Sequence, residues 1–172
     1  MKAAVPVFHR NVSRYNESDM LKLYVPKYED LSFRKMMMED EKTMSYNHAY
    51  GGCIPFPEEN WRSWYESWIL DTGGSRTYRY LQDEEESFVG EIAYHLDEKG
   101  RWMADLIIFS PYRGKGYGTK GLELLCLLAK ENGIKTLYDE IAIDNPSVSL
   151  FVRNGFKEES RDEEKITVRK EL

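Results

Sequence analysis

The pattern of hydrophobic and polar positions in the first half of the chain predicts a strand and two helices. Residues 20–26 alternate and predict a strand that ends at Pro26, and a helical stretch follows from about Glu29 through the methionines at 36–38. Within residues 56–74 the large apolar side chains recur at the spacing of one helix face: Trp61, Trp64, Tyr65, Trp68 and Ile69. We expect this face to pack on the core, with a substrate pocket lined by some of its rings as the alternative.

Residues 77–109 contain three strand-like runs. The runs cover residues 77–82, 87–96 and 101–109, and the short turns between them are typical of hairpins in a mostly antiparallel sheet. A helix from about Tyr117 follows, with apolar residues at helical spacing (Leu122, Leu125, Cys126 and Ala129), and Gly133 ends it. Residues 135–143 return to a strand, so this part predicts a βαβ unit.

The last part of the chain predicts a short helix and a terminal strand. Asn145 is the expected N-cap of that helix, Pro146 suits its first turn and Gly155 ends it. Residues 164–172 predict the strand.

Length, charge and cysteine usage narrow the class of protein. The 172 residues suit one domain, at residues 20–172, and the polar residues 1–19 form an extension that is either an added strand or a flexible arm. The net charge of -6 argues against a nucleic-acid or anionic-membrane partner, and it accommodates a cationic amine substrate. Cys53 and Cys126 lack disulfide or metal spacing and are expected as buried free thiols. Since no run is apolar enough to span a bilayer and no signal peptide is recognised, we expect a cytoplasmic protein.

The stretch FSPYRGKGYG, residues 109–118, lies between a strand and a helix. Backbone N–H groups at a helix N-terminus and the helix dipole together form an anion site, and Gly114, Gly116 and Gly118 let a phosphate approach the backbone. Arg113 and Lys115 add positive charge at the rim. The alternative is a glycine-rich turn with solvated cations.

Two other nucleotide-binding motifs fit this loop less well. The chain lacks the Gly-Lys-Ser/Thr that a Walker loop requires. Gly116, Gly118 and Gly121 do form the dinucleotide fingerprint G-x-G-x-x-G, with Asp139 or Glu140 about 20 residues further on. However, the chain after this loop is too short for a doubly wound dinucleotide domain, and the preceding strands predict an antiparallel sheet.

Two segments resemble the GNAT acyltransferase superfamily. RGKGYG resembles its Q/R-x-x-G-x-G/A signature, with Arg113, Gly116 and Gly118 at the fixed positions. NPSVSLFVRNGF resembles its second hallmark, an Asn-led short helix that ends in Gly-Phe. The resemblance covers residues 103–157 and extends in weaker form back to residue 20. It implies an α/β (mixed α+β) fold with a mostly antiparallel central sheet flanked by helices, whose central strands splay apart and hold acetyl-CoA.

The resemblance also implies where acetyl-CoA binds. The pyrophosphate would lie on the amides of residues 114–119, and residues 106–108 would bond the pantetheine arm and place one amide near the thioester oxygen. The implied cofactor-binding residues are Leu106, Ile107, Ile108, Arg113, Gly114, Lys115, Gly116, Tyr117, Gly118, Thr119 and Asn145. No metal site is expected.

Direct transfer to an amine requires a base for the amine and a donor for the oxyanion. The resemblance places candidate bases on the central strands: Glu91, Asp139 and Glu140, each of which is alternatively a solvated or ion-paired strand carboxylate. Because neighbouring strand residues point to opposite faces, we expect only one of Asp139 and Glu140 to face the cleft. His95, on the same strand face as Glu91, is a second-rank candidate.

The general acid of the family is missing. Phe151 occupies the position where many members carry a tyrosine that protonates the departing CoA thiolate. Water, Tyr117 or Tyr138 would replace that tyrosine, or the thiolate leaves unprotonated.

We therefore expect an acetyl-CoA-dependent N-acetyltransferase that acts on a primary amine of a small molecule, peptide or protein. The style of the sequence resembles that of bacterial members of the family. A non-catalytic acyl-CoA-binding module is the alternative, and homodimerisation through exposed aromatic or terminal strand surface stays open.

Overall fold

A seven-stranded sheet forms the centre of the molecule. The computed structural model describes residues 21–172, and the predicted extension at residues 1–19 lies outside them. The strand order is β1-β2-β3-β4-β5-β7-β6. The strands are β1 (Lys22–Tyr24), β2 (Arg76–Gln82), β3 (Phe88–Leu96), β4 (Trp102–Ile108), β5 (Thr136–Ala142), β6 (Lys157–Arg161) and β7 (Lys165–Glu171). Every neighbouring pair is antiparallel except β4 and β5, which run parallel, so the mixed α/β fold with a mostly antiparallel sheet is confirmed.

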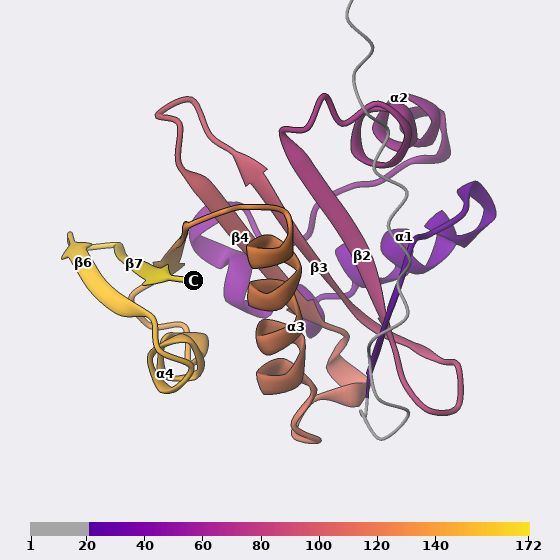
Figure 1. Cartoon of the computed structure of the whole chain (residues 1–172). Coiled ribbons are helices and arrows are strands. Elements are labelled where there is room, and N and C mark those ends of the chain that lie inside the picture. Colours follow the sequence, from indigo (N-terminus) through magenta and orange to yellow (C-terminus); the bar gives the residue numbers. More distant parts are fainter. Residues whose placement is uncertain (1–20) are drawn as a thin grey trace, which may run out of the picture.

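Helices cover both faces of this sheet (Figure 1). The α-helices are α1 (Leu31–Glu39), α2 (Trp61–Tyr65), α3 (Tyr117–Glu131) and α4 (Ser147–Arg153). The 3-10 helices are η1 (Tyr28–Asp30), η2 (Thr43–Tyr50), η3 (Glu58–Asn60) and η5 (Ser110–Tyr112), and η4 (Glu66–Leu70) is a π-helix. α3 joins the parallel strands β4 and β5 and lies in front of the sheet in Figure 1, as expected for the βαβ unit. No helix within residues 21–172 is long and apolar enough to cross a membrane.

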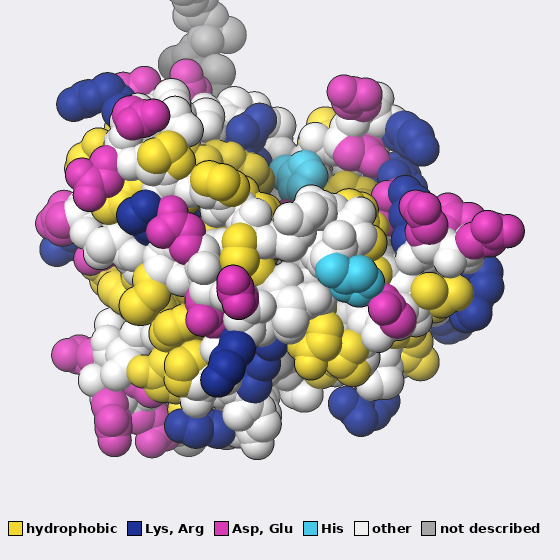
Figure 2. Space-filling view, turned by 180° about the vertical axis from the view of Figure 1, so that it is seen from behind, with side chains coloured by type: hydrophobic (Ala, Val, Ile, Leu, Met, Phe, Trp, Pro, Cys, Tyr) yellow, Lys and Arg dark blue, Asp and Glu magenta, His cyan; other side chains and the backbone are white. Residues whose placement is uncertain are grey.

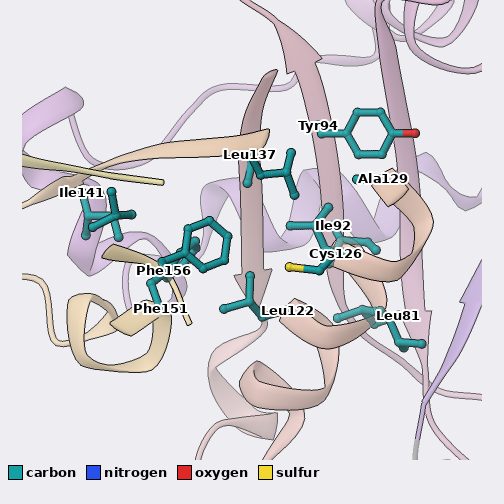
Figure 3. Close-up of a cluster of buried hydrophobic side chains, with 14 of the residues drawn as sticks. Leu81, Ile92, Tyr94, Leu122, Cys126, Ala129, Leu137, Ile141, Phe151 and Phe156 are labelled. Carbon is teal, nitrogen blue, oxygen red and sulfur yellow. The ribbon is translucent and has the colours of Figure 1, made fainter. Parts of the chain in front are cut away.

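The first hydrophobic core lies between the sheet and α3. Leu122, Leu125, Cys126 and Ala129 are buried there, as their helical spacing predicted. Figure 3 shows α3 side chains beside Leu81 and Ile92 of the sheet. A Cβ on Gly121 would lie 2.9 Å from Leu81 Cδ1 and 3.0 Å from Leu106 Cδ1. This third glycine of the dinucleotide-like pattern therefore permits close packing of α3 on the sheet.

The second hydrophobic core lies on the opposite face of the sheet. It contains the aromatic segment, which we define as residues 56–74. Trp61 is buried, and the other large side chains of the predicted helix face pack against the same core, so the core-facing prediction is confirmed. The segment is not one α-helix, because η3, α2 and the π-helical turn η4 follow one another. Asp71, directly after η4, donates its N–H to Glu66 C=O at 2.7 Å. The ring of Trp64 in α2 stacks on that of Trp68 in η4, with centroids 6.0 Å apart.

The strand β6, the 3-10 helix η2 and the exposure of Cys53 differ from the sequence predictions. β6 was not predicted, because all its residues are exposed and its sequence KEESR shows no apolar alternation; its pairing with β7 makes it a strand. η2 was not predicted either, and its first turn is held by tertiary contacts: Ser110 N–H donates to Thr43 Oγ1 at 2.9 Å. Cys126 is buried, but Cys53 is exposed, so the expectation of two buried thiols was wrong for Cys53.

Candidate active site

A cavity of about 730 Å³ opens where β4 and β5 separate. Met103 pairs with Tyr138, and no further β4–β5 pair follows in the described chain. Residues 103–108 line one side of the cavity and residues 139–142 line the other. The loop before α3 and the start of α4 contribute from one face of the sheet, and η2 contributes from the other. The cavity therefore reaches both faces between the splayed strands.

The loop before α3 presents free backbone donors. Gly116, with φ of 82°, directly precedes α3, and Gly114 has φ of 77°. A Cβ at either position would meet no atom within 4 Å, so the space beside the loop is open. Within residues 21–172, no N–H of residues 114–119 donates to a backbone carbonyl. These amides and the helix dipole form the anion-binding arrangement that the sequence predicted.

The guanidinium of Arg113 is occupied by hydrogen bonds to backbone carbonyl oxygens. Arg113 is therefore not the free cation at the rim of the loop that the sequence had predicted. Its guanidinium donates to the carbonyl oxygens of Ile108, Lys42 and Thr43 at 3.1, 3.0 and 2.6 Å. Burial lowers the pKa of Arg113. The residue ties the start of η2 to the end of β4, a role that sequence spacing could not reveal. Lys115, by contrast, extends over the ring of Tyr112, 5.2 Å from its centroid.

The edge of β4 beside the cavity shows which amides could contact a ligand. Phe109 N–H donates to Val89 C=O, so the backbone groups of Phe109 point to β3. A Cβ on Gly90 of β3 would lie 2.3 Å from Ile107 O, so Ile107 also points to β3. Because successive strand residues alternate, the backbone groups of Leu106 and Ile108 point into the gap. Consistently, Ile108 O accepts its hydrogen bond from Arg113 on that side.

Most of the implied cofactor-binding residues lie together on this cavity. The lining includes Leu106, Ile107, Ile108, Arg113, Gly114, Tyr117, Gly118 and Asn145. Lys115, Gly116 and Thr119 are not among the lining residues, although they belong to the same loop and helix start. The structure therefore brings the two motifs, separate in sequence, to one site.

The N-cap of α4 is Pro146, so the prediction of Asn145 as the N-cap was wrong by one residue. Asn145 Oδ1 accepts a hydrogen bond from Ser147 N–H at 2.9 Å, and Pro146 lies between them. Further along, Phe151 lines the cavity and its ring packs edge-on against Phe156, with centroids 4.9 Å apart (Figure 3). Of the two tyrosines considered as replacement acids, Tyr117 lines the cavity and Tyr138 does not.

Asp139 and Glu140 both belong to the residues that line the cavity, although neighbouring strand side chains point to opposite faces. The cavity lies between strand edges rather than on one face, and it therefore meets side chains of both orientations. Glu140 is paired with Arg101 at 3.0 Å and with Lys165 at 2.6 Å. Burial, with the nearby Asp105 charge as a further cause, raises the pKa of Asp139 well above its ordinary value.

Glu91 lies away from the cavity lining, in a polar cluster buried within the second core. Both its carboxylate oxygens lie within 2.7 Å of Arg34 Nη1, and Tyr78 Oη donates to it as well. The Arg34 guanidinium is packed among the rings of Phe56, Trp64 and Tyr78. Glu91 thus fits the alternative that it is an ion-paired strand carboxylate.

His95 and Asp105 also line the cavity and contact each other. His95 Nδ1 lies 3.0 Å from Asp105 Oδ2. Sequence reasoning ranked His95 second and missed Asp105. The available signal was an aspartate in the middle of the apolar strand β4, opposite Ala93 of β3. No group of three His, Cys, Asp or Glu side chains within residues 21–172 could hold a metal ion.

This fold, with an anion-binding helix start beside splayed strands, defines the acyltransferase class that the two motifs implied. The family profile described as acetyltransferase (GNAT) domain matches residues 21–157. The chain belongs to the GNAT acetyltransferase family, and the prediction that it is an enzyme of this class is confirmed.

Solved structures share this fold at low sequence identity. Spermidine N-acetyltransferase from Vibrio cholerae, in complex with CoA and spermine, is 18% identical, with 87% of this chain and 93% of that chain covered and a TM-score of 0.71. Microcin C7 self immunity acetyltransferase MccE, in complex with acetyl-CoA and AMP, is 16% identical, with 90% and 94% covered and a TM-score of 0.71. The GNAT domain of S. lividans PAT is 12% identical, with 88% and 89% covered and a TM-score of 0.69. No curated protein matches the sequence.

Proposed function

We propose that this protein transfers the acetyl group of acetyl-CoA directly to a primary amine within the cavity between β4 and β5. One observation carries the proposal: a single cavity joins the free amides of the α3 start to a partly buried carboxylate, Asp139, on the facing strand. The solved relatives whose names include CoA or acetyl-CoA support the choice of acyl donor.

The residues present fit acetyl-CoA. Free amides at residues 114–119 suit a pyrophosphate, and Gly114 and Gly116 leave room for it. Because Arg113 is occupied, positive charge for the phosphates comes from the helix start and from Lys115. The gap-facing backbone of Leu106 and Ile108 suits the pantetheine amides, and one of these N–H groups would stabilise the oxyanion of the thioester carbonyl.

Asp139 is the base that the geometry favours among the three candidates. Glu91 is engaged away from the cavity, and Glu140 is held by Arg101 and Lys165. As the amine nitrogen bonds to the thioester carbon, Asp139 takes a proton from that nitrogen, and the bond to the CoA sulfur then breaks. With Phe151 in place of the usual tyrosine, the protonated Asp139 carboxyl can return this proton to the thiolate.

The test is a thiol-release assay with acetyl-CoA and a panel of amines that includes polyamines. We expect Asp139→Asn to lower kcat by about 100-fold or more while the Kd for CoA stays unchanged. Because the base must be ionised, wild-type kcat/KM should rise with pH as Asp139 loses its proton, above the ordinary range of an aspartate. Glu140→Gln is the matched comparison, and it should retain turnover.

The competing function is a non-catalytic acyl-CoA-binding module. CoA binding without thiol release for any amine would favour that module. Loss of turnover in Glu140→Gln but not in Asp139→Asn would keep the enzyme and assign its base to Glu140.

A further inference from the structure

His95 and Asp105 form a hydrogen-bonded pair that the proposed transfer step does not use. They lie on neighbouring strands, β3 and β4, and both line the cavity. His95 Nδ1 is 3.0 Å from Asp105 Oδ2, and the edge of the Trp68 ring system packs near the imidazole with centroids 6.0 Å apart. The two side chains are about one third and one half exposed, so the pair is open to solvent.

The contact with Asp105 determines which imidazole nitrogen is available. A carboxylate only accepts hydrogen bonds, so Nδ1 of His95 carries the hydrogen and donates it. In the neutral ring Nε2 is then an acceptor with a free lone pair, and it has no hydrogen-bond partner within residues 21–172. This is the arrangement by which a carboxylate orients a histidine base.

The chemistry of the transfer leaves one proton unassigned. An alkylamine arrives as an ammonium ion, which cannot attack a thioester until it loses a proton. The nitrogen loses a second proton after attack, and Asp139 handles that one in the proposed function. The first proton must leave for solvent, and Asp139 is poorly suited to this task because its carboxyl already cycles one proton at the reaction centre.

We propose that His95, oriented by Asp105, is a second base that deprotonates the acceptor ammonium before it attacks. This inference rests on the proposed function. The ammonium N–H bond breaks, the proton binds His95 Nε2, and the imidazolium releases it to solvent through its exposed side. Over one turnover, ammonium and acetyl-CoA give the amide, CoA thiol and one proton. His95 is thus a catalytic residue, and Asp105 is a positioning residue.

The charges around His95 favour this role. The Asp105 hydrogen bond and charge raise the pKa of His95, whereas partial burial opposes the shift. Arg76 on β2 lowers it and Asp97 on β3 raises it by charge. A raised pKa makes the imidazole a stronger base, which helps it compete for the proton of an alkylammonium ion.

The decisive experiment compares two acceptors of equal size and different basicity. It uses the best alkylamine of the panel and its β,β-difluorinated analogue, whose nitrogen is largely neutral at pH 7.5. His95→Gln should lower kcat/KM about 100-fold for the alkylamine and only a few-fold for the fluorinated analogue. Asp139→Asn should impair both acceptors, because the second proton is lost in both reactions.

One control variant and two further measurements test the role of His95. His48→Gln changes an exposed histidine paired with Asp144 and should leave both rates unchanged. Added imidazole should partly restore His95→Ala with the alkylamine. Asp105→Asn should shift the pH profile and lower kcat more than it raises KM.

Equal losses for the two acceptors in His95→Gln, or no rescue by imidazole, would overturn the role of His95. Absence of transfer by the wild-type protein to any amine would instead overturn the proposed function.

Discussion

At the residue scale, the role of each strand carboxylate depends on the side chains and the space around it. Glu91 and Asp139 both lie on central strands with partly or fully buried side chains. The Arg34 charge neutralises Glu91 and Tyr78 donates a hydrogen bond to it, whereas Asp139 lines a cavity near the like charge of Asp105. A paired carboxylate stabilises the fold, and an unpaired one with a raised pKa suits proton transfer.

Glu91→Gln should therefore damage stability rather than chemistry. Removing one partner of a buried ion pair leaves the Arg34 charge uncompensated, so the free energy of unfolding should fall by about 3 kcal/mol. Denaturant unfolding measures this loss, and the turnover of the remaining folded protein should match wild type. Glu159→Gln, an exposed carboxylate 3.7 Å from Arg169, should change stability by less than about 1 kcal/mol. A stable Glu91→Gln protein without turnover would make Glu91 the base.

At the element scale, the start of α3 and the edge of β4 act together. α3 brings its N-terminal amides to the end of β4, and Gly121 lets the helix pack closely on the sheet beside Leu106. Arg113 attaches η2 to the same end of β4. The loop is therefore held from two sides, while its amides stay free.

Gly116→Asp should remove CoA binding without unfolding the protein. The position has open space, so the new side chain fits, and its positive φ costs about 1 kcal/mol for any residue with a Cβ. The added negative charge would take the place of the pyrophosphate, and the Kd for CoA should rise at least 100-fold by titration calorimetry. Gly116→Ala carries the same backbone strain without the charge and should bind much more tightly than Gly116→Asp. Equal affinities of the two variants would argue against the phosphate site.

At the scale of the whole molecule, the splayed strands β4 and β5 lie between two hydrophobic cores, one on each face of the sheet. α3 covers one face of the sheet, the aromatic segment covers the other, and histidine side chains reach the surface on the face that Figure 2 shows. Since the cavity is lined from both faces, a ligand bound there would connect elements far apart in the chain.

Acetyl-CoA and CoA should stabilise the whole domain, and NAD(H) should not. At a ligand concentration of 100 times Kd, the gain is about 2.7 kcal/mol, which for a domain of this size raises Tm by roughly 5 to 10 °C. A thermal-shift titration with each ligand measures this, and Gly116→Asp should lose the response. Stabilisation by NAD(H) alone would contradict the acyl-CoA site.

The sequence by itself determined the parts that depend on local geometry. Periodicity predicted the buried face of α3, because helical spacing brings Leu122, Leu125 and Ala129 to one side. The glycine loop likewise follows from a backbone conformation that favours glycine, since Gly114 and Gly116 both have positive φ. Each of the two family motifs is a short contiguous stretch of sequence, so both could be recognised without the structure. The fold was then predicted from these motifs.

Only the tertiary structure decided how the polar residues of the site are used. Arg34 and Glu91 are 57 positions apart, and Arg113 reaches a carbonyl 70 positions away, so no local pattern reveals either partnership. The splay of β4 and β5 admitted both Asp139 and Glu140, and strand pairing brought Asp105 to His95. The free energy of a buried charge depends on burial and on partners from distant segments, and both exist only once the chain has folded.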